Sequence, residues 1–401
     1  MAFGKGSHLH LVDGSAFIFR AFHALPPLTR KSDGLPVGAV SGFVNMLWKM
    51  IQDNNGPDAP THAAVVFDKG SITFRNHMYD LYKANRDEMP QDLRPQIPLT
   101  RDATRAFNLA CLEQEGFEAD DIIATLSCKA RDAGGRVTII SSDKDLMQLV
   151  GDGVVMFGDM KNTVIDREGV EAKFGVGPER VVDVQALAGD SVDNIPGAPG
   201  IGIKTAAQLI NEYGTLEQLL DRAEEIKQPK RRQTLIEQRA QIELSKKLVQ
   251  LDCDMALDYD LDSLEVKPPE AEPLLDFLTQ MEFRSIVRRV SGELGFDAPA
   301  MPEPTADATP DAPEQPPFPE EYTWIRTEAE LEDWIARATD QGIVAVDTET
   351  TALNEMQALL VGVSLALAPG EACYIPLGHK ENAEADLFAT DALAEGQMPM
   401  D

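Results

Sequence analysis

The sequence predicts an α/β protein whose first domain is a parallel sheet covered by helices. Short apolar stretches alternate with helical patterns through the first 180 residues, which is typical of a parallel sheet with helices on both faces. Several of these apolar stretches are followed directly by aspartate. From Val181 onward the pattern becomes helical and includes a glycine-rich turn, so we expect a second, helical domain.

The chain of 401 residues has room for two or three domains. We predict an α/β catalytic domain at residues 1–180, a helical domain with a helix-hairpin-helix at 181–290, and an acidic linker rich in proline and alanine at 291–321. Residues 322–401 would then start another α/β fold that is cut off before it is complete.

In the first domain, apolar runs predict strands at residues 8–12, 62–67, 137–140 and 154–157. Helical periodicity lies between them and predicts helices at residues 37–52, 99–115 and 120–133. Three of the strands are followed by Asp13, Asp68 and Asp143. Ligands bind beyond the carboxyl ends of parallel strands, so these side chains are expected to meet at one edge of the sheet. The alternative is that each aspartate only caps the helix or turn that follows it.

The densest acidic stretch runs from residue 116 to 145, and its carboxylates flank one helix and one strand. They are Glu118, Asp120, Asp121, Asp143 and Asp145. Crowded carboxylates repel one another and raise one another's pKa unless cations share the site. The stretch therefore predicts a divalent-metal site, and Mg²⁺ suits it because this ion prefers oxygen ligands.

Basic and aromatic residues interleave in the segment 69–105, which includes Tyr82, Lys83 and Arg86. Such a mixture suits contacts with phosphates and stacking on bases. The alternative is a solvated, proline-broken excursion, because acidic residues dilute its charge. Arg20 is a further candidate for a phosphate contact.

The helical domain begins with two more carboxylates, Asp190 and Asp193, whose spacing lets both face the same way on a helical turn. A hairpin at residues 195–206 follows. Backbone N–H groups at a glycine-rich turn before a helix form an anion site, which can grip a DNA backbone without reading its sequence. The candidate contacts are Gly197, Gly200, Gly202, Lys204 and Thr205. The alternative is a simple connection between two helices.

The C-terminal region predicts a helix at residues 331–338 and strands at 342–346, 359–367 and 372–376. Asp347 and Glu349 follow the first of these strands. Taken alone, this Asp-x-Glu pattern is only a weak indication of metal binding.

The formal net charge of −31 is unevenly distributed. Residues 291–401 hold 23 acidic and 3 basic residues, which leaves 44 acidic and 33 basic residues in the rest of the chain. Cations bound to the acidic cluster would offset part of that charge, so a nucleic-acid partner is not excluded. Four scattered cysteines without a C-x-x-C pair argue against zinc and against a disulfide framework, and fit a reducing cytosol. The sequence predicts no signal peptide and no membrane span.

Several motifs together resemble the 5′-nuclease domain of bacterial DNA polymerase I, over residues 7–290. They are LVDGSAFIFRAFHALPPLT, AAVVFD, FRNHMYDLYKANR, FEADDIIATL, SSDKDLMQLV and LAGDSVDNIPGAPGIGIKTA. The later VAVDTET resembles the start of the 3′–5′ proofreading domain of the same family. The resemblance implies a PIN-like 5′-nuclease domain with a helix-hairpin-helix subdomain, then a truncated ribonuclease H-like segment.

The resemblance also implies a structure-specific 5′–3′ exonuclease or flap endonuclease that uses two Mg²⁺ or Mn²⁺ ions in primer removal and repair. Its metal carboxylates would be Asp13, Asp68, Glu118, Asp120, Asp121, Asp143, Asp145, Asp190 and Asp193. Lys83 and Arg86 match basic residues that contact the scissile phosphate, and Arg20 is also matched. The hairpin matches the family's duplex-binding element, which in relatives can hold a potassium ion.

We assign Asp13, Asp68, Glu118 and Asp120 to one metal, and the other five carboxylates to the second. Asp347 and Glu349 match the first proofreading motif, but their partner carboxylates are absent from this chain, so we expect no 3′–5′ activity.

The expected partner is DNA with a 5′ flap, a nick or a single-stranded 5′ arm, bound by a monomer in the bacterial cytoplasm. Two alternatives remain at this point. A single-strand RNase would have little use for a duplex-gripping hairpin, and a non-catalytic DNA-binding module would not require nine carboxylates.

Overall fold

The computed structural model describes residues 2–25, 27–53, 56, 59–86, 88–158, 163–295, 323–351, 358–368, 370–379 and 396–398. The chain forms two compact units, Met1–Met301 and Pro302–Asp401, and each is described by itself.

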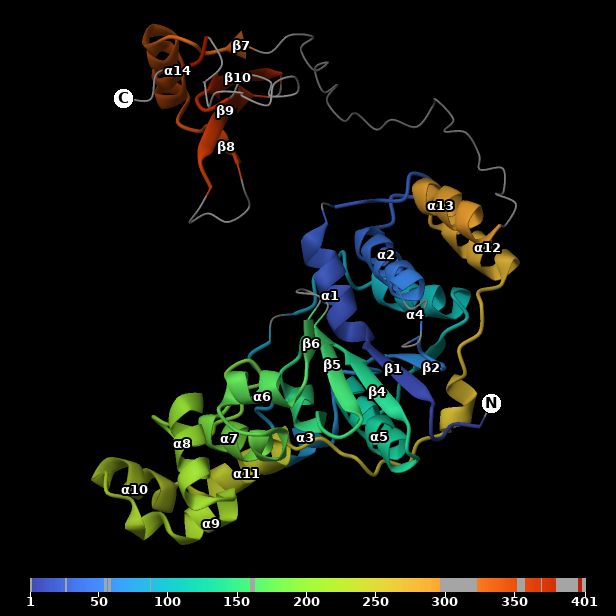
Figure 1. Cartoon of the computed structure of the whole chain (residues 1–401), viewed down its shortest axis with the longest axis vertical. Helices are drawn as coiled ribbons and strands as arrows, with labels where there is room; N and C mark the ends of the chain where they lie inside the picture. The colour runs from blue at the N-terminus through green and yellow to red at the C-terminus, as the bar shows by residue number, and fades with distance from the viewer. Residues whose placement is uncertain are drawn as a thin grey trace, which may run out of the picture. The chain divides into compact units, whose positions relative to one another are not determined.

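The first unit is organised around a six-stranded sheet with the strand order β3-β2-β1-β4-β5-β6 (Figure 1). Strands β1 to β5 run parallel, and β6 is antiparallel to β5. The strands are β1 His8–Asp13, β2 His62–Val66, β3 Ala110–Leu112, β4 Arg136–Ile140, β5 Val154–Gly158 and β6 Thr163–Ile165. The predicted parallel sheet is confirmed, with β3 and β6 as additions at its two edges.

The central strand β1 is buried along its whole length and supplies side chains to a core on each face of the sheet. Leu9 and Leu11 pack in one core with Ile122 of α5, whereas Val12 packs in the other with Phe43 of α2. Helix α5 (Ala119–Asp132) therefore covers one face. The opposite face is covered by α1 Gly14–Ala24, α2 Gly38–Asp53 and α4 Gln96–Ala106 (Figure 1).

The helix predicted at residues 99–115 is wrong in its second half. Helix α4 ends at Ala106, and Asn108 adopts the left-handed backbone conformation with φ of 58°. Asparagine tolerates that conformation better than most residues, so it breaks the helix at little cost. Residues 110–112 then pair with the outer edge of β2 as strand β3. Hydrogen bonds to β2 stabilise this short strand, which its apolar pattern did not predict.

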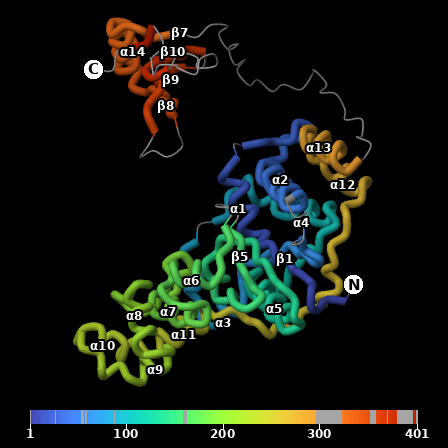
Figure 2. Tube along the Cα trace, viewed as in Figure 1, coloured from blue at the N-terminus to red at the C-terminus, as the bar shows by residue number. Residues whose placement is uncertain are grey.

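The helical part follows the strands of the sheet in the chain, and the helices after it pack against the α/β core again. Its helices are α6 Arg167–Phe174, α7 Val181–Ala188, α8 Ile203–Tyr213, α9 Leu216–Asp221, α10 Pro229–Glu237 and α11 Arg239–Val249. Two later helices, α12 (Ala271–Gln280) and α13 (Arg284–Leu294), pack in the same core as α2, as the tube view also shows (Figure 2). The last two helices of the predicted helical domain at residues 181–290 therefore belong to the α/β core.

The predicted start of the linker at residue 291 is wrong by one helical turn. Helix α13 continues to Leu294 because Val290 and Ser291 are still buried against the core, and Gly295 ends it in the left-handed conformation. The remainder of the predicted linker lies outside the described residues, apart from these first positions.

The second unit has a four-stranded sheet with the order β7-β10-β9-β8, in which β8, β9 and β10 are antiparallel. Its elements are β7 Thr323–Trp324, α14 Glu328–Gln341, β8 Ala345–Thr350, β9 Leu360–Ala368 and β10 Glu371–Pro376. Strand β8 starts later than predicted because Gly342 caps α14 in the left-handed conformation. Asp347 and Glu349 consequently lie within β8 rather than after it.

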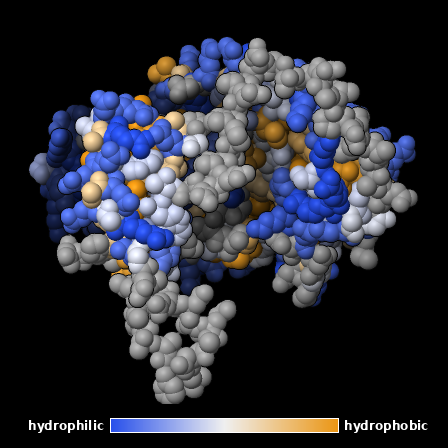
Figure 3. Space-filling model, turned by 90° about the horizontal axis from the view of Figure 1, so that it is seen from above, coloured by the Kyte–Doolittle hydropathy of each residue, from blue (hydrophilic) through white to orange (hydrophobic). Residues whose placement is uncertain are grey.

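None of the described helices is long and apolar enough to span a membrane. On the face seen in the space-filling view, hydrophilic residues predominate among the coloured ones, and hydrophobic residues form small patches among them (Figure 3).

Candidate metal centre

Carboxylates from several segments gather at the carboxyl edge of the large sheet. Asp13 is the last residue of β1, Asp68 follows β2, and Asp143 follows β4. Asp120 lies in the first turn of α5. Each of Asp13 and Asp120 is repelled by Asp68 and Asp143, so these four side chains form one electrostatic cluster.

Burial, together with repulsion inside this cluster, raises the pKa of its carboxyl groups. Burial raises the pKa of Asp13 to about 6; hydrogen bonds from the Ala16 N–H and the Ser141 hydroxyl lower it, and Asp68 and Asp143 raise it further. Burial and the neighbouring carboxylates raise the pKa of Asp120 well above its ordinary range. A divalent cation would relieve this repulsion, so the donor set fits such an ion.

Asp68 is held in place from three sides. The Ser15 hydroxyl donates to its Oδ2 at 2.7 Å, and the N–H of Ala119 donates to its Oδ1 at 2.8 Å. Arg101 donates to its main-chain oxygen at 2.7 Å. Sequence reasoning missed Ser15 and Ser141, although both lie within two residues of a strand end, which was the available signal.

A second group of carboxylates lies beside the first. Burial and Asp143 raise the pKa of Asp145 to about 7; Gln185 lowers it by a hydrogen bond, and Asp190 and Asp193 raise it. Asp143 thus influences both groups. The structure brings residues from β1, β2, β4, α5 and the turn after α7 to one region, as the sequence predicted for the sheet edge.

Lys83 and Arg86 lie against these carboxylates. Lys83 Nζ is 2.9 Å from Glu118 Oε1 and 3.6 Å from Asp193 Oδ2. Arg86 Nη2 is 2.6 Å from Asp193 Oδ1. Burial lowers the pKa of Lys83, but Glu118 and Asp193 raise it more in sum, so the net shift is upward and the ammonium group stays charged. The Tyr82 hydroxyl also donates to Glu118 Oε2 at 3.1 Å.

Lys144 is a cation that sequence reasoning did not single out. Its Nζ lies 2.6 Å from Asp190 Oδ2. Within the part of the chain that the structure describes, no three acidic, histidine or cysteine side chains converge closely enough to form a metal site as they stand. The ammonium groups of Lys83 and Lys144 instead pair with Glu118 and Asp190 and neutralise part of the charge.

The structure places Asp121, which the sequence predicted as a metal ligand, in a buried ion pair. Its side chain is fully buried and forms a two-point ion pair with Arg75, at 2.6 Å and 2.8 Å. The N–H groups of Glu118 and Asp252 donate to its two oxygens as well. These partners engage both oxygens, so Asp121 joins α5 to the segment after α11, and Arg75 also lies 3.5 Å from Glu118.

The hairpin divides into a packed part and an exposed part. Gly197 donates its N–H to Ser245 Oγ at 3.1 Å, and a Cβ at this position would lie 2.3 Å from the nitrogen of Gly189. Gly197, predicted as a phosphate contact, therefore uses its N–H within the fold and allows close packing against Gly189. Gly200 and Gly202 have open space around them, and Gly202 is the N-cap of α8.

The remaining predicted contacts lie on helices. Lys204 is exposed and Thr205 half-buried in the first turn of α8. Arg20 lies on α1, the helix that Asp13 caps.

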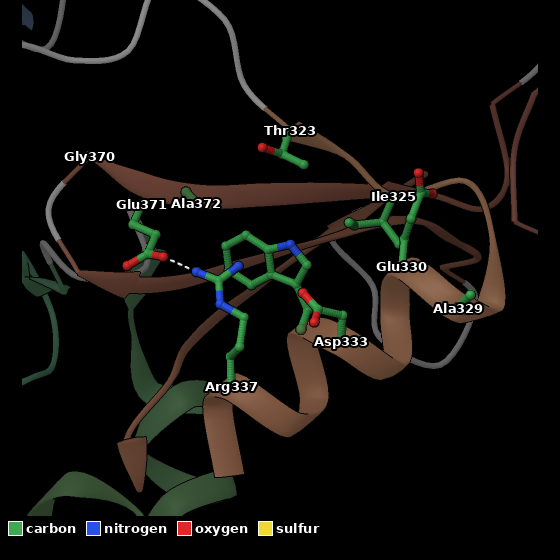
Figure 4. Close-up of a pocket in the computed structure, with 10 residues that line it drawn as sticks. Thr323, Ile325, Ala329, Glu330, Asp333, Arg337, Gly370, Glu371 and Ala372 are labelled. Carbon is green, nitrogen blue, oxygen red and sulfur yellow. Dashed lines mark hydrogen bonds and ion pairs between the residues drawn. The ribbon is translucent and has the colours of Figure 1, made fainter. Parts of the chain in front are cut away.

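In the second unit, Asp347 and Glu349 are exposed on β8, and their spacing places both on one face of the strand. The pocket of about 650 Å³ in this unit is lined by other residues, between α14 and β10 (Figure 4). There the Arg337 guanidinium lies over the Trp334 ring, 4.6 Å from its centroid, and pairs with Glu371.

Comparison with known proteins adds to this geometry. Residues 8–175 match the family model of the 5′–3′ exonuclease N-terminal resolvase-like domain, and residues 176–272 match that of the 5′–3′ exonuclease C-terminal SAM fold. A 5′–3′ exonuclease of Aquifex aeolicus is 38% identical over 282 residues, which are 70% of this chain and 94% of that protein. The chain belongs to the 5′–3′ exonuclease family. The predicted resemblance is thereby confirmed.

This 5′–3′ exonuclease family member also resembles longer proteins. DNA polymerase I of Rhizobium leguminosarum is 48% identical over 99% of this chain and 46% of its own length. DNA polymerase I of Pseudomonas aeruginosa is 39% identical over 98% of this chain and 42% of its own length. The chain thus spans about half the length of these relatives. Residues 322–395 match a 3′–5′ exonuclease family model.

Solved structures confirm the fold expected for the family. T5 5′-exonuclease with bound zinc ions has a TM-score of 0.54 at 22% identity, over 69% of this chain and 98% of that one. T5 D15 protein crystallised with metal ions has a TM-score of 0.52 at 23% identity, over 60% of this chain and 89% of that one. At this level of identity the likeness concerns the fold alone.

Proposed function

We propose that this 5′–3′ exonuclease family member hydrolyses phosphodiester bonds of DNA that carries a 5′ flap, a nick or a single-stranded 5′ arm, with Mg²⁺ or Mn²⁺ as cofactor. The observation that carries the proposal is the gathering of carboxylates at the sheet edge, with Lys83 and Arg86 against them. Neither a simple helix cap nor a solvated surface accounts for carboxylates whose pKa values are raised by burial and by one another.

Two bound ions would supply an activated water and stabilise the leaving oxygen. Asp13, Asp68, Asp120 and Asp143 are proposed to hold one ion, and Asp145, Asp190 and Asp193 to hold or orient the other. Lys83 and Arg86 would exchange their carboxylate partners for the phosphate of the substrate and stabilise its charge. Glu118, which accepts from Lys83, would be released to take part in metal binding when Lys83 moves.

The exposed part of the hairpin is proposed to seat the duplex. Gly200 and Gly202 leave their surroundings open, and Lys204 and Thr205 start α8 beside them. Asp190 and Ile195 exchange two backbone hydrogen bonds, at 2.8 Å and 2.7 Å, so the hairpin and the second carboxylate group belong to one rigid turn. We propose that duplex binding and metal binding are coupled through this turn, that a potassium ion can bind at the hairpin, and that the protein acts as a monomer in the cytoplasm.

The proposal is tested with Asp120→Asn and with Asp132→Asn as its matched control at the exposed end of the same helix. Asp120→Asn should abolish Mg²⁺-dependent cleavage of flap DNA while flap binding in EDTA is unchanged, and Asp132→Asn should behave like the unaltered chain. Full cleavage by Asp120→Asn would overturn the site. Binding without cleavage by the unaltered chain would indicate a DNA-binding module, and equal cleavage of single-stranded RNA would indicate the RNase alternative.

A second readout does not depend on catalysis. Mg²⁺ binds only the folded cluster, so it should raise the thermal midpoint of the unaltered chain. The shift should be smaller for Asp120→Asn and unchanged for Asp132→Asn.

A further inference from the structure

Two cysteines that the sequence places far apart meet on the surface of α5. Cys128 lies in α5, and Cys253 lies four residues beyond the end of α11. Their sulfur atoms are 2.7 Å apart although 125 positions separate them in the chain. All four cysteines of the chain are free thiols in the structure. Cys111 and Cys373 lie elsewhere, in β3 and β10.

Hydrogen bonds along one face of α5 keep the two sulfur atoms close together. Asp121, Thr125 and Cys128 follow one another at helical spacing on that face. The N–H of Asp252 donates to Asp121 Oδ1 at 3.0 Å, and the Thr125 hydroxyl donates to the oxygen of Asp252 at 2.8 Å. These contacts fix the residue next to Cys253 against the helix, so the two sulfurs are neighbours because of the fold.

The environment favours reaction at Cys128. The hydrogen bond with Cys253 lowers the pKa of Cys128 to about 7 against the effect of burial, and Arg131 lowers it further. The same hydrogen bond raises the pKa of Cys253. Cys128 is partly exposed and Cys253 is exposed, so small oxidants can reach both. A partly ionised, accessible thiol beside a second thiol is the usual setting of a redox-active cysteine.

We propose that Cys128 and Cys253 form a redox-active dithiol that a low-molecular-weight disulfide such as oxidised glutathione converts reversibly into an intrachain disulfide. The Cys128 thiolate attacks one sulfur of the oxidant, forms a mixed disulfide and releases one thiolate. Cys253 then loses its proton and its sulfur attacks that of Cys128, which releases the second thiolate. Two electrons pass to the oxidant, which becomes two thiols, and the protein loses two thiol protons.

The bond would close a loop that contains α7 to α11, including the hairpin and Asp190. It would link the segment after α11 covalently to α5, whose first turn carries Asp120. We therefore expect oxidation to suppress local opening of residues 250–255, because opening would need the crosslinked ends to separate.

The test uses the full chain in buffers with increasing ratios of oxidised to reduced glutathione. Titratable thiols in denaturant should fall from the four of the reduced chain to two, and non-reducing peptide mapping should find one linked pair that carries Cys128 and Cys253. Dithiothreitol should restore all four. The control Cys111→Ser should still lose two thiols, whereas Cys253→Ser should form no intrachain link.

Hydrogen exchange at residues 250–255 should slow on oxidation of the unaltered chain and of Cys111→Ser, but not of Cys253→Ser. Retention of all four thiols at the most oxidising ratio would overturn the proposal. So would glutathione adducts without an intrachain link, or links that involve Cys111 or Cys373. The peptide map of the unaltered chain decides the matter even if a variant folds poorly.

Discussion

Replacing Asp121 with asparagine should destabilise the fold strongly, whereas the same change at the neighbouring Asp120 should not. Asp121 is 0% exposed and Arg75 is 1% exposed, and both guanidinium nitrogens of the pair lie within 2.8 Å of a carboxylate oxygen. Asparagine removes the negative charge and one acceptor, which leaves the buried guanidinium with only the more distant Glu118, 3.5 Å from its Nη1, as a counter-ion. Breaking such a pair costs about 3–5 kcal/mol, a large part of the stability of a typical domain.

Asp120 is in the opposite electrostatic situation one residue away. Burial and the charges of Asp143, Asp13 and Asp68 raise its pKa, so its ionised form is unfavourable in the folded, metal-free chain. An asparagine side chain at this position would carry no charge to be repelled. Asp120→Asn should therefore leave the free energy of unfolding unchanged or raise it at neutral pH in EDTA.

The measurement is urea unfolding in EDTA, followed by far-UV circular dichroism, for both variants and the unaltered chain. If Asp121→Asn were as stable as the unaltered chain, and Asp120→Asn clearly less stable, the assignment of the two residues would be refuted. The double variant Arg75→Met with Asp121→Leu adds a check. It should recover part of the loss, because a buried ion pair replaced by apolar residues of similar size is often neutral.

Three further predictions concern other parts of the first unit. Burial lowers the pKa of His10 from its ordinary 6.5 to about 3, so the unfolded chain binds a proton there first on acidification. Lowering the pH from 7 to 5 should thus reduce the free energy of unfolding by about 2 kcal/mol through this residue. His10→Leu should lose less stability over the same pH range, and an equal loss in the variant and the unaltered chain would refute the assignment. Gly197→Ala should cost about 1–3 kcal/mol, because φ is +57° and the Cβ would strike Gly189; calorimetry checks this. Thr215→Ala should cost about 1 kcal/mol in urea unfolding, because the Thr215 hydroxyl accepts from the N–H of Gln218 at the start of α9.

The positions of most candidate carboxylates could be predicted because strand direction is a local property of the sequence. Apolar runs of strand length identified β1, β2 and β4, and in a parallel sheet their carboxyl ends must share an edge. Asp13, Asp68 and Asp143 come within three residues of the end of those runs, so their meeting follows from the chain pattern alone. The family resemblance then supplied the activity that this edge was expected to perform.

Which carboxylate faces the cluster depended on tertiary contacts. Asp120 and Asp121 are adjacent and chemically identical, yet successive residues of a helix point about 100° apart. One faces the cluster, and the other meets Arg75, a partner whose side chain also donates to the oxygen of Leu248, at the end of α11. No local pattern contains that partner, because it comes from a different part of the chain.

The same reason accounts for the other contacts that only the folded chain revealed. Lys144 reaches Asp190 from another segment, and Cys253 reaches Cys128 across 125 positions. The chain pattern determined which residues end each strand and each helix. Packing between distant segments decided which charges are paired and which remain to bind a ligand, because pairing energies depend on distances that the order of residues does not specify.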